Sequence, residues 1–199
     1  MANPAYIDAE TGVLTDGEAW VALQTQAPGS DVSTVTFTSP NDGSSTDWSQ
    51  FMDLILLSYA RSSRSGVQGG FVCQLNANGS NYKIQYMEGR STGNTVHAIY
   101  ESNTGARLGA FPGNGSTSGF FGSSIMTLHD INSDKFKSVD CMGGCNMRGT
   151  GTANLISTIW LNQSAITSFV ISESGGSSYA NVVAGSRFDL FGVLPRMVS

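Results

Sequence analysis

The sequence predicts an all-β fold, an antiparallel β-sandwich of jelly-roll type with about eight main strands and an extended N-terminal arm. Glycine supplies 24 of the 199 residues, and charged residues only 13%, against typical shares of about 7% and ~25%. Because glycine and asparagine supply the positive φ of tight turns, whereas long helices are rich in Ala, Glu and Lys, this composition favours short strands. Strand-like runs recur every 10 to 20 residues or so, with no amphipathic helix between them, which disfavours a parallel βαβ architecture.

The first 31 residues differ from the rest and predict an arm for docking or inter-subunit contacts. Their apolar residues are scattered between turn signals, and the stretch closes at Ala27-Pro28-Gly29-Ser30. One short strand is expected within it, at residues 19–24. The jelly-roll domain is expected over residues 32–199, a length that can bury a full core.

Within that domain, strands are expected wherever an apolar or β-branched run is bounded by turn residues. Residues 51–59 are nearly continuously apolar; periodicity alone would allow a helical turn, but the bounded length favours a strand buried on both faces. Residues 70–76 and 81–88 flank Asn78-Gly79, a strong hairpin signal. The glycine-rich residues 108–122 are expected to be a long surface loop. The remaining expected strands are residues 32–38, 95–101, 124–131, 136–142, 153–161, 166–172 and 187–194.

The charge and the segment pattern exclude several classes of partner. A net charge of −5 and a pI near 4.8 argue against nucleic acid, which requires a basic footprint. No apolar run approaches the ~18 residues of a membrane helix, and the N-terminus lacks the features of a signal peptide. We therefore expect a soluble chain made in the cytoplasm, with no membrane partner.

No constellation of residues predicts catalysis or metal binding, so we expect a non-enzymatic protein without cofactor or metal. The sequence lacks G-x-S-x-G and a phosphate-binding Gly-Lys-Ser/Thr, its carboxylates are spread singly, and His97 and His129 fit strand or turn positions. Residues 130–134 resemble the start of a calcium loop but lack its Gly and final Glu, which indicates a polar turn. Cys73, Cys141 and Cys145 are expected as free or opportunistically oxidised thiols, the last two in a turn; a small-loop disulfide or a metal site remains an alternative.

The aromatic residues divide into core and contact candidates. Trp160 lies in an apolar strand and is expected in the core, whereas Trp20 and Trp48 lie in polar, irregular surroundings and are candidates for contact with another chain. In the last strand, alternation places Phe188 and Leu190 on the core face and Phe191 on the opposite face. Phe191 then needs a cover from a loop of the second sheet, the arm or a neighbouring subunit.

Several segments from residue 32 onward carry a family resemblance. They are the apolar run 51–59 with its polar and basic continuation, Asn78-Gly79 with the following Asn81-Tyr82, the strand around 125–139 with Lys135 and Lys137, and above all residues 159–168 and 184–192. In these segments the chain resembles a jelly-roll module of tailed-bacteriophage structural proteins. It departs from that pattern at Phe191, where the family usually has Tyr, and at Ala77, where an acidic or glycine turn residue is usual.

This resemblance implies a virion structural protein, and the single module with a short arm favours a capsid decoration or cement protein. Its partners would be the major capsid protein and other copies of itself in a homotrimer, and its location the outer surface of the capsid. A tail-associated receptor-binding or carbohydrate-binding module is the alternative, and a host-surface esterase or glycosidase a weaker one. The candidate interface residues are Tyr6, Ile7, Val13, Leu14, Trp20, Trp48, Phe111 and Phe191.

Overall fold

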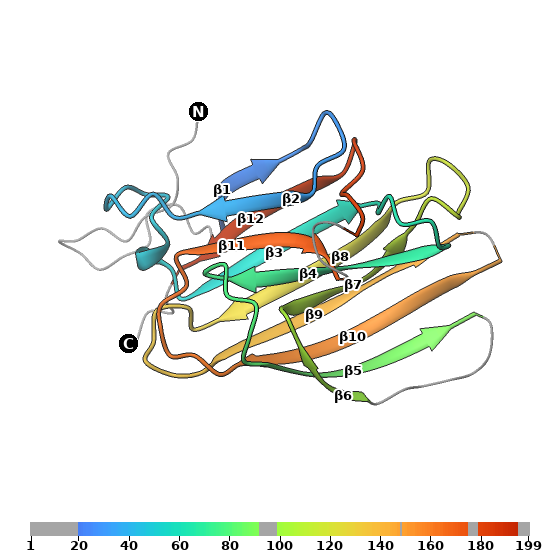
Figure 1. Cartoon of the computed structure of the whole chain (residues 1–199). Helices are drawn as coiled ribbons and strands as arrows, with labels where there is room; N and C mark the ends of the chain where they lie inside the picture. The colour runs from blue at the N-terminus through green and yellow to red at the C-terminus, as the bar shows by residue number, and fades with distance from the viewer. Residues whose placement is uncertain (1–19, 92–98, 148, 175–178, 195–199) are drawn as a thin grey trace.

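A computed structural model describes residues 20–91, 99–147, 149–174 and 179–194. In these residues the chain forms twelve strands in two antiparallel sheets and one short 3-10 helix, and the two sheets pack face to face (Figure 1). The strands are β1 (Trp20–Gln26), β2 (Thr34–Thr38), β3 (Asp53–Ala60), β4 (Gln68–Leu75), β5 (Tyr82–Arg90), β6 (Ile99–Asn103), β7 (Ala106–Pro112), β8 (Gly122–His129), β9 (Lys137–Asn146), β10 (Gly151–Trp160), β11 (Ser168–Glu173) and β12 (Arg187–Val193), and the helix is η1 (Trp48–Gln50).

The strand order confirms the jelly roll. The larger sheet runs β1-β12-β3-β8-β9-β10-β5-β6 and the smaller sheet β2-β11-β4-β7. Eight strands remain when the neighbours β5 and β6 and the hairpin β9–β10 are set aside. Numbered 1 to 8 in chain order, they run 1-8-3-6 in the larger sheet and 2-7-4-5 in the smaller sheet. This is the arrangement of two interlocked Greek keys. The four additional strands extend one side of the larger sheet, and we call them the wing.

Alternation along the strands builds a single main core between the sheets. In β12, Phe188 and Leu190 are buried and Phe191 lies on the other face, as the sequence predicts. Trp160 is fully buried and stacks on Tyr82, with ring centroids 6.0 Å apart. Residues 51–59 contribute the strand β3, buried along most of its length, so the helical alternative does not apply.

The strand expected within the N-terminal arm is part of the sandwich. It corresponds to β1, which pairs antiparallel with β12 at the edge of the larger sheet. Residues 20–31 thus lead directly into the jelly roll, and residues 1–19 lie outside the described residues.

The predicted hairpin at Asn78-Gly79 is wrong. β4 belongs to the smaller sheet and β5 to the larger one, so the intervening turn carries the chain between sheets. The left-handed residues between β4 and β5 are Asn76, Ala77 and Asn81, with φ of 49°, 53° and 67°, rather than Asn78 and Gly79. The Tyr82 hydroxyl accepts a hydrogen bond of 2.7 Å from the Leu75 amide, which fixes the crossover between the sheets. The hairpin does not form because burial of the two flanking strands in opposite layers outweighs the local turn preference of Asn78-Gly79.

The long loop expected at residues 108–122 is also wrong in its first part, because residues 106–112 form β7, which pairs with β4. Only residues 113–121 connect β7 to β8, and the buried Arg61 guanidinium fixes this connection. It donates hydrogen bonds of 2.8 to 3.0 Å to the carbonyl oxygens of Gly113, Ser116, Thr117 and Phe120. Four acceptors on one planar donor group make this connection an ordered part of the fold.

Candidate functional site

The structure separates the candidate interface residues. Trp48 and Phe111 are buried in the core, so the prediction that they contact another chain is wrong. Trp48 packs on Phe169 with ring centroids 5.5 Å apart, and Phe111 packs on Phe71 with ring centroids 5.0 Å apart. Trp20 remains 44% exposed, and Phe191 is half-buried beside it. Tyr6, Ile7, Val13 and Leu14 lie outside the described residues.

The outer face of the larger sheet carries a continuous apolar row that the sequence reading did not identify. Strand pairing places Met87, Leu155, Met142, Ile125 and Leu57 side by side across β5, β10, β9, β8 and β3. The first three are among the most exposed large apolar side chains of the described residues, at 51%, 54% and 60%. We call these five residues the apolar row. A shallow hollow over Met87 and Leu155 adds concave apolar surface to it.

The outer face of the smaller sheet has the opposite character. Thr34, Thr36 and Thr38 on β2 are exposed, and Ser168 and Gln74 lie on the neighbouring strands at outward positions of the same sheet. Hydroxyl and amide groups of this kind remain well hydrated. The apolar row therefore lies among polar positions such as Ser157 and Asp140 on the outer face of the larger sheet, whereas the outer face of the smaller sheet is mainly polar, with Val170 between Thr36 and Gln74.

The smaller sheet ends at β7, and the strands of the wing continue beyond it (Figure 1). A polar cleft lies at this edge. β7 packs over β9 and β10, and the inward residues of β10 and β5 beside it, among them Asn154 and Glu88, are themselves buried. The cleft has a volume of about 180 Å³. We call it the wing cleft; its polar lining includes Arg64, Gln68, Glu88, Arg90, Arg107, Asn154 and Ser174, and the largely buried Tyr86 and Ile156 also line it.

Three arginines from separate segments converge on the wing cleft. Arg90 Nη2 lies 2.9 Å from Glu88 Oε2, and this hydrogen bond raises the pKa of Arg90. Arg64 Nη1 lies 3.2 Å from Oε1 of the fully buried Glu173. The Arg107 guanidinium carbon lies 4.9 Å from the centroid of the Tyr86 ring, in cation–π contact.

Backbone features help to shape the cleft. The ladder between β4 and β7 is interrupted by a bulge beside Gly109, whose φ is +100°, and bulges reorient neighbouring side chains. Asn154 Oδ1 accepts a hydrogen bond of 3.1 Å from the Ala110 amide, which ties β10 to β7 across the two sheets.

The sequence of β10 contains a signal for both the apolar row and the wing cleft. Its inward positions include Thr152, Asn154 and Thr158, whereas its outward positions include Leu155 and Ile159. In an ordinary sandwich strand the apolar residues face inward. The alternation of polar and apolar residues in β10 is visible in the sequence. Which of its two faces points inward is decided only by the pairing of β10 with β5 and β9.

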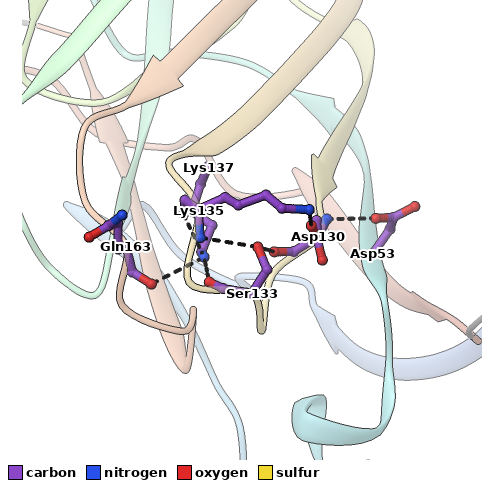
Figure 2. A network of polar contacts seen from close by, with 6 residues as sticks. All are labelled: Asp53, Asp130, Ser133, Lys135, Lys137 and Gln163. Carbon is purple, nitrogen blue, oxygen red and sulfur yellow. Dashed lines mark hydrogen bonds and ion pairs between the residues drawn. The ribbon is translucent and has the colours of Figure 1, made fainter.

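The turn that resembles a calcium loop is held by a lysine. Figure 2 shows Lys137 reaching toward the turn, where its ammonium group donates to the carbonyl oxygens of Ser133, Lys135 (2.9 Å) and Gln163 (3.3 Å). Burial lowers the pKa of Lys137. The Asp130 amide donates to Asp53 Oδ1 at 2.7 Å, which fixes the other side of the same turn.

The remaining residues that could take part in catalysis or metal binding lie apart from the wing cleft. His129 ends β8 on the outer face, with Nε2 3.3 Å from Asp140 Oδ2 and Nδ1 4.0 Å from Asp53 Oδ2, and His97 lies outside the described residues. Cys141 and Cys145 lie in strand β9, not in a turn, and both are buried free thiols, as is Cys73. Four residues of strand span about 13 Å, too far for a disulfide between them.

Two negative findings apply to the described residues. None of them forms a helix with the length and apolar character needed to cross a bilayer. Nor do three or more His, Cys, Asp or Glu side chains of this part of the chain gather in a geometry suited to a metal ion.

Comparisons with known proteins do not assign a family. No family model matches the chain, and no curated protein matches it. Among solved structures, lectin II from Ulex europaeus aligns over 89% of this chain and 94% of its own, with 9% identity and a TM-score of 0.28. A structure of infectious bursal disease virus, Gt strain, aligns over 98% of this chain and 45% of its own, with 12% identity and a TM-score of 0.13. Scores of this size indicate no shared fold beyond what the strand order already establishes.

Proposed function

We propose that this chain is a non-enzymatic structural protein of a bacteriophage particle, a decoration protein that binds the major capsid protein and stabilises the head. The observation that carries the proposal is the contrast between the two outer faces of the sandwich. The apolar row crosses five strands of one face, whereas the other face presents mainly threonine, serine and glutamine, with Val170 among them.

An apolar row of this extent on a folded domain is a site for a protein partner. Monomeric soluble proteins rarely expose contiguous apolar patches larger than a few hundred Å², and patches above that size mark interaction surfaces. A sandwich with an apolar row on one outer face and a mainly polar opposite face suits a coat component that has one side on the particle and the other in water. The segments that resemble the phage module fit the same role, and closed assembly into a homotrimer would use part of this surface.

The test is to change the apolar row without changing the fold. Leu155→Asp places a charge in the row between Met87 and Met142, and Thr36→Asp places the same charge on the opposite outer face as a matched control. We expect wild type and the Thr36 variant to sediment as trimers and to bind purified heads of the phage that carries this gene, and the Leu155 variant to fold but lose both properties. A wild-type chain that is strictly monomeric and absent from reconstructed particles would contradict the proposal.

The wing cleft favours a second candidate function, a tail-associated receptor-binding or carbohydrate-binding module. Binding sites are concave and bring a few polar groups together, and this cleft is lined by three arginines and an asparagine. Adsorption of the purified protein to host cells or to a glycan array tests this candidate. If the protein binds neither host cells nor any glycan of the array, this second candidate function is wrong, and the proposed decoration role is unaffected.

A further inference from the structure

The tripeptide Asn-Gly-Ser occurs twice in the chain, at residues 78–80 and at residues 114–116. The first copy lies in the crossover between β4 and β5, and the second in the connection between β7 and β8. We infer that the first copy is a self-modifying site, where Asn78 loses its side-chain amide to attack by the backbone nitrogen of Gly79, whereas the fold protects the second copy.

The reaction needs only the chain itself and water. The backbone nitrogen of Gly79 forms a bond to Cγ of Asn78, the bond from Cγ to Nδ2 breaks, and ammonia leaves, which closes a succinimide ring. Water then opens this ring at either of its carbonyl groups and leaves aspartate or isoaspartate at position 78. Glycine favours the attack because it has no Cβ to crowd the nitrogen, and neighbouring residues hold the two reacting groups close together. Either product adds a negative charge to the crossover between the sheets.

The attacking nitrogen of Gly79 is accessible in the native fold. Gly79 is exposed, and its amide donates a hydrogen bond to no other residue that the structure describes. A Cβ at this position would first meet Nε2 of Gln74, at 3.2 Å, which is the end of a flexible side chain. The crossover therefore neither binds this nitrogen in a hydrogen bond nor encloses it between other backbone segments.

Ser80 activates the carbonyl group that is attacked. Oδ1 of Asn78 accepts a hydrogen bond of 2.8 Å from the Ser80 amide and another of 2.8 Å from the Ser80 hydroxyl. This oxygen gains negative charge as the Gly79 nitrogen adds to Cγ. Two donors already directed at the oxygen stabilise that charge in the manner of an oxyanion hole.

The second copy of the tripeptide lacks both features. The Gly115 amide donates a hydrogen bond of 3.0 Å to the carbonyl oxygen of Gly66, and a Cβ on Gly115 would lie 2.9 Å from the carbonyl carbon of the same residue. The amide and the hydroxyl of Ser116 both donate to the carbonyl oxygen of Gly113 instead of to Asn114. The attacking nitrogen and the activating donors are thus bound to other acceptors, and this connection must open before Asn114 can react.

The experiment follows both asparagines in the full-length protein during incubation at mildly alkaline pH. Peptide mapping by mass spectrometry locates the mass gain that results when an amide becomes an acid, and an isoaspartyl methyltransferase measures the isoaspartate formed. Incubation in denaturant is the matched control, because the two sites then have the same Asn-Gly-Ser sequence without the fold. Gly79→Ala hinders the attacking nitrogen, Ser80→Ala removes the hydroxyl donor, and Ser80→Thr keeps a hydroxyl at that position.

We expect Asn78 to lose its amide at least about 10-fold faster than Asn114 in the native protein, the factor that corresponds to opening hydrogen bonds worth about 1.4 kcal/mol. In denaturant the two rates should be similar. Gly79→Ala should slow the reaction at Asn78 strongly. Ser80→Ala should slow it in the native protein but not in denaturant, and Ser80→Thr should retain the wild-type rate. Equal native rates at the two asparagines, or a faster reaction at Asn114, would overturn the site, and an unchanged native rate in Ser80→Ala would overturn the role of the serine hydroxyl.

Discussion

The indole of Trp20 in β1 packs against the ring of Phe191 in β12, with centroids 6.0 Å apart and planes inclined by 49°. Trp20 thus provides the cover that Phe191 requires on the outer face, from within the same sheet. We predict that Trp20→Ala lowers the free energy of unfolding by about 1 kcal/mol, the usual contribution of an aromatic pair. Urea denaturation measures this change. Phe136→Ala, at a residue exposed to a similar degree (52% against 44%), should change stability less.

Arg61 is predicted to be essential for the connection between β7 and β8. Its replacement by alanine removes the common donor of four carbonyl oxygens, and we expect a loss of about 3 kcal/mol, since hydrogen bonds to charged groups are worth roughly 1.5 to 3 kcal/mol each and are not additive. Arg61→Lys keeps the charge but not the planar fork, so it should lose less. Limited proteolysis should cut residues 113–121 faster in both variants; unchanged cleavage would contradict this role.

Lys137→Met tests the lysine-centred turn. Methionine preserves most of the buried stem but leaves the carbonyl oxygens of Ser133, Lys135 and Gln163 without the ammonium donor. Unsatisfied buried acceptors cost about 1 to 3 kcal/mol each before relaxation, so we expect a net loss of roughly 2 kcal/mol in thermal or urea unfolding. Lys135→Met, which removes an exposed ion pair with Asp130, serves as the control and should be near neutral. Equal losses in the two variants would show that the buried ammonium has no special role.

Gly192 in β12 is predicted to tolerate no side chain. A Cβ at this position would lie 2.4 Å from Cδ1 and 2.5 Å from Cγ of Phe51. We expect Gly192→Ala to destabilise the protein by about 1 to 3 kcal/mol through overpacking. Gly89→Ala in β5, where a Cβ would have no neighbour within 4 Å, should instead be neutral or stabilising by up to about 1 kcal/mol, because alanine restricts the unfolded chain. The difference between the two unfolding midpoints is the measurement.

The buried thiols are predicted to make stability fall at alkaline pH. Burial raises the pKa of Cys141 to about 12 and the pKa of Cys73 also rises, because both thiolates would be desolvated. Unfolded thiols ionise near pH 8.5, so above that pH the folded state retains more protons and its advantage decreases as the pH rises toward the folded pKa values. Each thiol contributes a slope of at most about 1.4 kcal/mol per pH unit.

The same burial predicts slow labelling of the native thiols. At pH 8 a thiol-specific reagent should label Cys73, Cys141 and Cys145 slowly in the native protein and rapidly in denaturant. Rapid labelling of Cys141 under native conditions would contradict the burial of β9 on which this prediction depends.

The sequence by itself determined the fold class and the faces of several strands. Its glycine content, its β-branched runs and the alternation in residues 187–193 specify short strands, and they place Phe188 and Leu190 inward and Phe191 outward, as the structure confirms. Periodicity succeeds here because side chains alternate strictly across a strand and one face of β12 is buried.

The tertiary structure alone decided which strands are neighbours, and with that both candidate surfaces. Asn78-Gly79 suggested a hairpin, but β4 and β5 bury their apolar faces in different sheets, so the chain crosses between layers. Trp48 and Phe111 stand among polar and glycine residues in the chain, yet distant strands enclose them. Met87, Leu155 and Met142 become one apolar row, and Arg64, Arg90 and Arg107 one cleft, only through pairing between segments far apart in the chain. Long-range pairing depends on how the buried faces of all strands combine, which no local window of the sequence contains.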